Sequence, residues 1–217
     1  MRRFALALLL ALAATPALAD AGNSLFPSTR RVELSAADRD ALDAVSAYLN
    51  SIVTLKGGFI QVEPSGAVDE GTFYISKPGR MRFEYKPPVP TLIVSDGSTV
   101  AVANTRLNTV DRYPLFETPL DVILNKSIDL RHNPALVSVA RQDGAFVVNL
   151  RANQAHTKAN ISLVFSAPDY ELRQWTVIDN QGLSTTVALR DLQPGAVLAP
   201  SLFVLPDMNP FARRREN

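Results

Sequence analysis

Residues 73–97, FYISKPGRMRFEYKPPVPTLIVSDG, decide the fold class of this chain. Hydrophobic and polar side chains alternate both before and after Pro78-Gly79. After it, the hydrophobic residues are Met81, Phe83 and Tyr85, and charged residues stand between them. Successive side chains of a β-strand point to opposite faces, so the pattern predicts strands that each have one apolar and one polar face. The strands predicted in this stretch are 70–77, 80–86 and 91–95.

The same period of two continues along most of the remaining chain. Turn signals such as Ser95-Asp96-Gly97 and Asp143-Gly144 separate the alternating segments. Short connections favour an antiparallel meander, and about eleven short strands curl into a barrel or fold into a sandwich. The expected strands are 58–63, 70–77, 80–86, 91–95, 98–104, 107–112, 136–142, 145–151, 159–166, 170–179 and 183–191.

An N-terminal helix is predicted from residue 35 to about residue 54. Ser35 and Asp38 have the spacing of a helix N-cap and its reciprocal partner. Hydrophobic residues then recur at helical spacing, which indicates an amphipathic helix with one apolar face. They are Leu42, Val45, Leu49 and Ile52.

A second, short helix is predicted between the two halves of the sheet, over residues 118–124. Thr118 is a suitable N-cap and Pro119 is suited to the first helical position. Its apolar residues follow the i, i+3, i+4 pattern, so this helix could cover an open face of the sheet.

The N-terminus has the three parts of a secretory signal. Arg2-Arg3 forms a basic start, an apolar run follows, and Ala17-Leu18-Ala19 is a cleavage site before Asp20. The apolar run is too short to serve as a stable membrane anchor. We therefore expect three regions: a signal peptide at 1–19, a leader of low order at 20–34, and a single domain at 35–217.

Charge and cysteine content limit the class of protein further. Once residues 1–19 are removed from the 217, 198 residues remain, with 20 Lys and Arg against 21 Asp and Glu. This near-neutral balance gives no electrostatic reason to expect nucleic acid as a partner. The chain has no cysteine, so disulfides and acylation of an N-terminal cysteine are both excluded. We expect a soluble protein in the bacterial periplasm.

Patterns typical of catalysis or metal binding are scarce. The two histidines, His132 and His156, lie in polar loop contexts and have no metal-ligand spacing. There is no G-x-S-x-G elbow and no phosphate-binding glycine loop. We expect no catalytic residue, no metal and no cofactor. The abundant apolar strand residues are explained from periodicity alone as an ordinary core.

The chain resembles the periplasmic outer-membrane lipoprotein carrier (LolA-like) family over about residues 35–205. The resemblance lies in the order and spacing of several motifs rather than in any single one. These are the aromatic strand before Lys77-Pro78-Gly79, then Arg82-Phe83-Glu84-Tyr85, Leu92-Ile93-Val94-Ser95-Asp96-Gly97, Gly58-Phe59-Ile60-Gln61, Thr118-Pro119-Leu120 and Leu172-Arg173-Gln174-Trp175.

This resemblance implies a mainly β fold: an incomplete, strongly curved antiparallel β-barrel with an N-terminal helix and a short lid helix over its concave apolar face. It implies a monomeric carrier that takes acylated lipoproteins from an inner-membrane ATP-driven exporter to an outer-membrane acceptor. A periplasmic sensor or scaffold on the same half-barrel, and a carrier of another lipid, are the alternatives. The implied lipid-binding residues are Phe59, Phe73, Ile75, Met81, Phe83, Tyr85, Leu92, Val94, Leu120, Ile123, Leu124, Phe165 and Trp175.

The resemblance also gives Lys77 a role. In the family, a basic residue before this proline closes the lid by donating to backbone carbonyls of a lid helix. Lys77 keeps the charge without the planar fork of arginine. Its parity with Phe73 and Ile75 directs it inward, and we expect it to bond the helix predicted at 118–124. The alternative is a lysine that only extends its amine to water.

Overall fold

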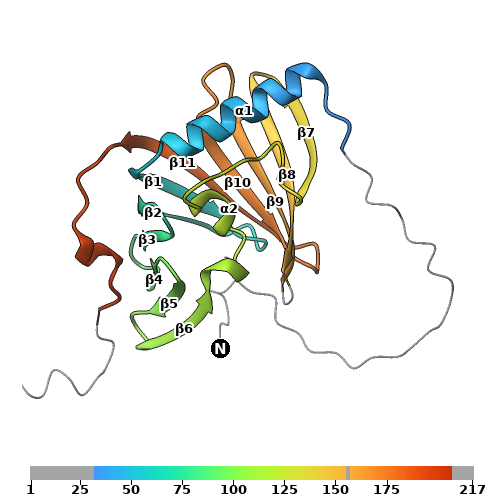
Figure 1. Ribbon diagram of the computed structural model, residues 1–217. Helices are drawn as coiled ribbons and strands as arrows, with labels where there is room; N and C mark the ends of the chain where they lie inside the picture. Colours follow the sequence, from blue (N-terminus) through green and yellow to red (C-terminus); the bar gives the residue numbers. More distant parts are fainter. Residues whose placement is uncertain (1–31, 155–156, 207–217) are drawn as a thin grey trace, which may run out of the picture.

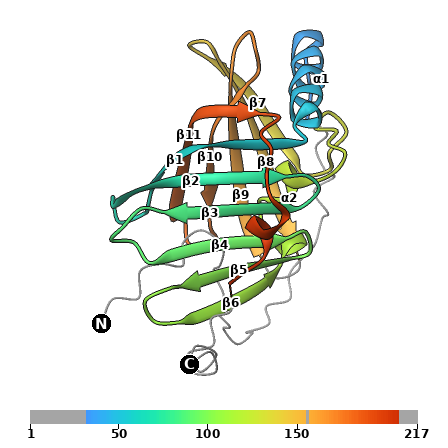
Figure 2. The ribbon, with the colours of Figure 1, turned by 90° about the vertical axis from the view of Figure 1, so that its left-hand side faces the viewer.

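The computed structural model describes residues 32–154 and 157–206 of the 217-residue chain. The predicted signal peptide and most of the leader lie outside the described residues. Eleven strands form one antiparallel sheet in the order β6-β5-β4-β3-β2-β1-β11-β10-β9-β8-β7. The two edge strands, β6 and β7, do not pair with each other, so the curved sheet remains an open barrel (Figures 1 and 2).

Each predicted strand corresponds to one strand of the structure, and the predicted class of a mainly β, incomplete antiparallel barrel is confirmed. The strands are β1 (Thr54–Val62), β2 (Val68–Ser76), β3 (Arg80–Tyr85), β4 (Thr91–Asp96), β5 (Thr99–Asn104), β6 (Thr109–Pro114), β7 (Leu136–Gln142), β8 (Ala145–Gln154), β9 (Thr157–Ser166), β10 (Leu172–Ile178) and β11 (Ser184–Pro194).

Helix α1 (Ala36–Ser51) begins with the predicted capping box. The Ser35 hydroxyl accepts from the Asp38 backbone N–H, and the Asp38 carboxylate accepts from the Ser35 N–H. The apolar side of α1 packs into the same cluster as the inner face of the sheet. Figure 1 shows the helix lying across strands of the β7–β11 half.

Helix α2 (Asp121–Leu124) begins later than predicted. The Thr118 N–H and hydroxyl both donate to the carbonyl of Leu115, at 2.9 and 2.8 Å, and so close the preceding 3₁₀ turn η1 (Leu115–Glu117). The prediction of Thr118 as the cap and Pro119 as the first helical residue is therefore wrong, although the short helix itself is present. Figure 1 shows α2 inside the curve of the sheet.

After β11 the chain crosses the outer face of β3 and β4. The 3₁₀ turn η2 (Pro200–Phe203) lies there, and the Leu202 carbonyl accepts a 3.1 Å hydrogen bond from the Arg82 guanidinium. The Arg80 guanidinium lies 5.6 Å from the centre of the Phe203 ring. This part of the sheet is therefore covered on both faces. Within the described ranges, no helix is long and apolar enough to span a membrane.

Candidate functional site

The strand register shows which side chains face the concave side of the sheet. Phe73 pairs with Phe83 and Ile75 with Met81 across β2 and β3, so these four side chains share one face. All four are buried in the main apolar cluster. The alternation read from the sequence therefore assigned the correct face to these strands.

Aromatic rings form a continuous group on this face. The Phe83 ring centre lies 5.1 Å from that of Phe59, 5.7 Å from that of Phe73 and 6.1 Å from that of Trp175. Tyr85 joins the group through Phe59, at 5.0 Å. Most of these contacts are edge-to-face, a geometry favoured by the ring quadrupoles. Strands β1, β2, β3 and β10 thus share one aromatic surface.

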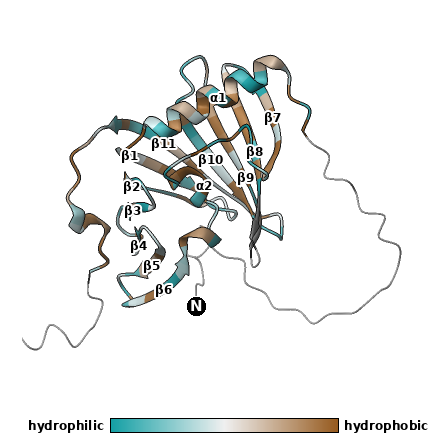
Figure 3. Ribbon diagram, in the orientation of Figure 1, coloured by the Kyte–Doolittle hydropathy of each residue, from teal (hydrophilic) through white to brown (hydrophobic). Residues whose placement is uncertain are grey.

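The β8–β11 half extends the apolar surface with residues that were not singled out from the sequence. Phe146, Val148 and Leu150 alternate along β8 and are all buried, as are Leu163 of β9 and Val187 of β11. The alternation in residues 146–150 was the signal that could have identified three of them. Figure 3 shows hydrophobic positions recurring along these strands.

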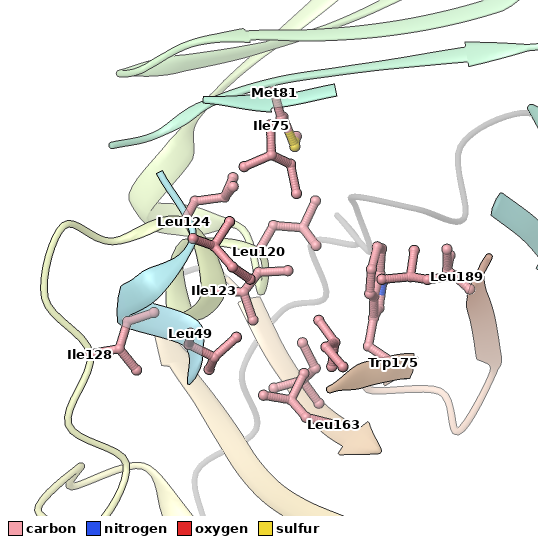
Figure 4. Close-up of a cluster of buried hydrophobic side chains, with 14 of the residues drawn as sticks. Leu49, Ile75, Met81, Leu120, Ile123, Leu124, Ile128, Leu163, Trp175 and Leu189 are labelled. Atoms are coloured by element: carbon pink, nitrogen blue, oxygen red, sulfur yellow. The ribbon is translucent and has the colours of Figure 1, made fainter. Parts of the chain in front are cut away.

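Helices α1 and α2, with the connection that includes Ile128, cover the concave face; we call these three parts the lid. Leu49 of α1, Ile123 and Leu124 of α2, and Ile128 are all buried in the same cluster as the sheet residues. Figure 4 shows Leu49, Ile123 and Leu124 on the side of the lid that faces the sheet residues Leu163 and Trp175. The structure therefore shows the concave face in its covered state.

Polar contacts hold α1 to the connection after α2. The Asn50 side chain donates to the carbonyl of Ile128 and accepts from its N–H, both at 2.9 Å. The Ser46 hydroxyl accepts from the Leu130 N–H at 3.0 Å and donates to Leu42. Because these bonds connect parts of the lid to one another, the lid can be displaced from the sheet without breaking them.

Lys77 connects the sheet to the lid. Its ammonium donates to the carbonyl of Leu49 in the last turn of α1 at 2.8 Å, and its backbone N–H donates to Val53 at 2.9 Å. Burial lowers the pKa of Lys77 to about 8, since the charged form loses water. The predicted inward direction and helix-carbonyl partner are present, but the expectation of a partner in residues 118–124 is wrong.

The turn after Lys77 contacts α2 through the backbone instead. The Gly79 N–H donates to the carbonyl of Leu124 at 2.9 Å. Gly79 has a φ of +71°, and a Cβ there would lie 2.6 Å from the carbonyl oxygen of Gly97. A side chain is therefore excluded at this position. The turn 77–79 thus bonds both lid helices.

Leu92 and Val94 do not face the concave side, and their predicted place among the lining residues is wrong. They pair with Glu84 and Arg82 on the outer face and pack with Leu205 of the C-terminal segment. Ile93 pairs with Phe83 and lies in the concave cluster instead. Five consecutive residues, 91–95, are buried here because both faces of β4 are covered, so alternation could not identify which face is the concave one.

The structure brings together the other predicted lining residues. Tyr85 packs against the main cluster, and the rest are buried within it: Phe59, Phe73, Ile75, Met81, Phe83, Leu120, Ile123, Leu124, Phe165 and Trp175.

Polar groups also lie on this face. The Tyr85 hydroxyl donates to the Gln61 side-chain oxygen at 2.7 Å, and burial raises the pKa of Tyr85. The Trp175 indole N–H is buried, and it finds no acceptor among residues 32–151 and 159–206.

Metal-binding geometry is not found in the part of the chain that the structure describes: no group of three or more His, Cys, Asp or Glu residues could hold an ion there. His132 is exposed and its ring nitrogen lies 2.8 Å from the Asp129 carboxylate. His156 lies outside the described residues.

Known proteins resemble this chain over most of its length. The family model described as outer membrane lipoprotein carrier protein LolA matches residues 50–206. An outer-membrane lipoprotein carrier protein of Methylibium petroleiphilum is 33% identical over 103 residues, which are 43% of this chain and about half (51%) of that protein. One from Xylella fastidiosa is 27% identical over 173 residues, 73% of this chain and 80% of that protein.

A solved LolA superfamily structure from Nitrosomonas europaea aligns with a TM-score of 0.43 and 9% identity, over 76% of this chain and 97% of that one. The family model, by contrast, matches 157 consecutive residues, well over half of the chain. They include the whole sheet, α2 and the turn 77–79. The chain belongs to the outer membrane lipoprotein carrier protein LolA family.

Proposed function

We propose that this protein carries acylated lipoproteins through the periplasm, with the acyl chains held on the concave face of the half-barrel. The observation that carries the proposal is the aromatic surface of β1, β2, β3 and β10 beneath a lid of separate helices. Membership of the lipoprotein carrier family supports it.

Acyl chains need such a surface to cross an aqueous compartment. Each CH₂ group moved out of water contributes about 0.8 kcal/mol, so an exposed acyl chain partitions strongly into membranes or aggregates. The concave face offers buried apolar side chains from strands on both halves of the sheet. The protein then works by binding and release rather than by catalysis.

Loading requires the lid to move. In the covered state, Leu49, Ile123 and Leu124 occupy the space over the sheet that acyl chains would take. Lys77 donates to Leu49 and Gly79 to Leu124, so both bonds from the turn 77–79 must break or shift on opening. Re-forming them favours the ligand-free state and helps expel the cargo at delivery.

The proposed route begins at an inner-membrane ATP-driven exporter and ends at an outer-membrane acceptor, with the carrier acting as a monomer in the periplasm. The N-terminal secretory signal pattern supports export to that compartment. Both partners present or receive the cargo at a membrane, while the carrier shields it between them.

Mass spectrometry of material that co-purifies with the native periplasmic protein tests this function. We expect acylated lipoproteins in the bound fraction. Recovery of phospholipid or another lipid alone, without lipoproteins, identifies a carrier of a different cargo. Recovery of a protein partner without any acyl chain favours the sensor or scaffold alternative.

A further inference from the structure

The concave face holds one polar atom that the covered state leaves without a partner. Trp175 lies in the middle of β10 and only 1% of its surface is exposed. Its indole N–H is the single buried side-chain nitrogen or oxygen within residues 32–151 and 159–206 for which no hydrogen-bond partner is found. Buried tryptophan N–H groups normally find an acceptor, because leaving a donor unpaired out of water is costly.

The surroundings of Trp175 explain why no acceptor is near. On the neighbouring strands its register partners are Leu163 and Val187, both apolar and buried. Its ring is in edge contact with Phe83. Figure 4 shows the indole nitrogen among apolar side chains, close to Leu189. None of these side chains can accept a hydrogen bond.

Packing alone does not require this donor. A purely apolar side chain at this position would introduce no unpaired polar group into the cluster. The nearest polar pair in the same row of the sheet is Gln61 with Tyr85, two strands away beyond Val187, and these two groups already bond each other. The N–H of Trp175 is therefore available to a molecule that replaces the lid over the sheet.

We infer that Trp175 donates a hydrogen bond to the carbonyl of an ester- or amide-linked acyl chain when the concave face is loaded. This inference rests on the proposed carrier function, and it assigns to Trp175 part of the specificity of the carrier for acyl chains. A carbonyl directly attached to a long hydrocarbon is the acceptor that an otherwise apolar site admits at the least cost. The bond recognises acyl chains and discriminates against alkyl chains of the same length, which lack the carbonyl.

Two matched probes test the assignment. One is a lipopeptide with two ester-linked palmitoyl chains, and the other is the same peptide with two ether-linked hexadecyl chains. Displacement of a fluorescent hydrophobic dye gives both dissociation constants. We expect the native protein to bind the ester form about five-fold more tightly, which corresponds to about 1 kcal/mol for one neutral hydrogen bond.

Two variants separate the hydrogen bond from packing. Trp175→Phe removes the N–H, and we expect the ester and ether forms to bind it equally. Phe83→Leu trims a ring in contact with Trp175 and leaves the donor in place, so both affinities should fall while the five-fold ratio persists. If Trp175→Phe does not fold, Trp175→Met removes the donor with a flexible apolar side chain, and the ester and ether forms should bind that variant equally.

The outcomes distinguish the two levels of the account. Equal binding of ester and ether forms by the native protein overturns the role of Trp175 and leaves the carrier function standing. A preference that Trp175→Phe retains also overturns it. Failure of both lipopeptides to displace the dye contradicts the carrier function itself. A second pair of probes, ester- and ether-linked phosphatidylethanolamine, shows whether the carbonyl belongs to a lipoprotein or to a phospholipid. If only the phosphatidylethanolamines show an ester preference, the carbonyl is not that of a lipoprotein.

Discussion

The Lys77 ammonium lies 2.8 Å from the carbonyl oxygen of Leu49, so a residue at the end of β2 bonds the last turn of α1. Lys77 is the residue directly after β2, and Leu49 lies on the buried face of α1. This contact joins the sheet to the lid. Together with the Gly79–Leu124 bond and the bond that the Arg141 side chain donates to the Ala37 carbonyl at 2.8 Å, it opposes opening.

Lys77→Leu should strengthen lipopeptide binding and slow its release. Loading must break the Lys77–Leu49 bond, and a hydrogen bond from a charged donor contributes about 1.5–3 kcal/mol. Removing the donor takes that cost away from the loaded state, but it also removes the desolvation that lowers the pKa of Lys77 in the closed state, so binding should become tighter by no more than about ten-fold. The measurement is a two-step assay, from exporter to carrier and from carrier to acceptor.

In that assay, uptake by Lys77→Leu should persist and delivery should slow. Lys126→Leu is the control, because Lys126 is an exposed lysine near α2. Equal delivery rates for Lys77→Leu and the native protein would remove Lys77 from the mechanism, and a loss in both steps would indicate misfolding.

Lipopeptide affinity should fall as the pH rises above 8. Burial lowers the pKa of Lys77 to about 8 in the closed state, and exposure on opening returns it toward 10.5. Between these values the open state binds more protons than the closed state, so raising the pH favours closure. Unfolding also exposes Lys77, so the contribution of Lys77 to the free energy of unfolding likewise rises as the pH increases from about 8 to 10.5.

The pH effect is measured as the dissociation constant at pH 7 and at pH 9.5. The two pKa values set an upper limit of about thirty-fold, and because the Lys77 ammonium is partly exposed to screening solvent we expect an increase of about ten-fold in the native protein. Lys77→Met, which has no titrating group, should show little change over the same range. A parallel loss of affinity in both proteins would assign the effect to other groups.

Phe83→Ala should destabilise the protein strongly. The Phe83 ring contacts Phe59, Phe73 and Trp175, and truncating a buried phenylalanine costs about 3–5 kcal/mol. Phe116→Ala is the matched control, because that ring is 58% exposed and its removal should change the free energy of unfolding by less than about 0.5 kcal/mol. Urea unfolding measures both, and similar values for the two variants would show that Phe83 is not a core residue.

Neighbouring residues of β4 should differ in their contact with the cargo. Ile93 faces the concave side and Leu92 the outer side, beneath the C-terminal segment. Photo-reactive benzoylphenylalanine placed at Ile93 should cross-link a bound lipoprotein, whereas the same group at Leu92 should not. Circular dichroism checks that both variants fold, and cross-linking from position 92 alone would reverse the assigned faces.

Ile93 and Leu92 also show which parts of the fold can be predicted from the sequence. Alternation located the strands and oriented β2 and β3 correctly, because one face of each strand is apolar and the other is polar in β2 and charged in β3. It failed in β4, where the segment around η2 covers the outer face and both parities are apolar. That covering contact joins residues about 110 positions apart, and no local pattern encodes it.

The lid contacts were predictable only in part. Parity placed Lys77 inward, but the choice between α1 and α2 as its partner depends on how the two helices lie over the sheet. The hydrogen bonds between Asn50 and Ile128 likewise depend on how α1 and the connection after α2 lie relative to each other. Whether the N–H of Trp175 has an acceptor depends on every side chain around it. The sequence therefore identified Trp175 as a lining residue but could not show that its donor is unpaired.

The central claim is that the concave face binds acyl chains, and dye displacement tests it most directly. The folded protein is saturated with a fluorescent hydrophobic dye and titrated with a triacylated lipopeptide or with the same peptide lacking its acyl chains. The account predicts displacement by the acylated peptide at one equivalent per protein and none by the unacylated one. Retention of the dye at saturating acylated peptide, or equal displacement by both peptides, would contradict it.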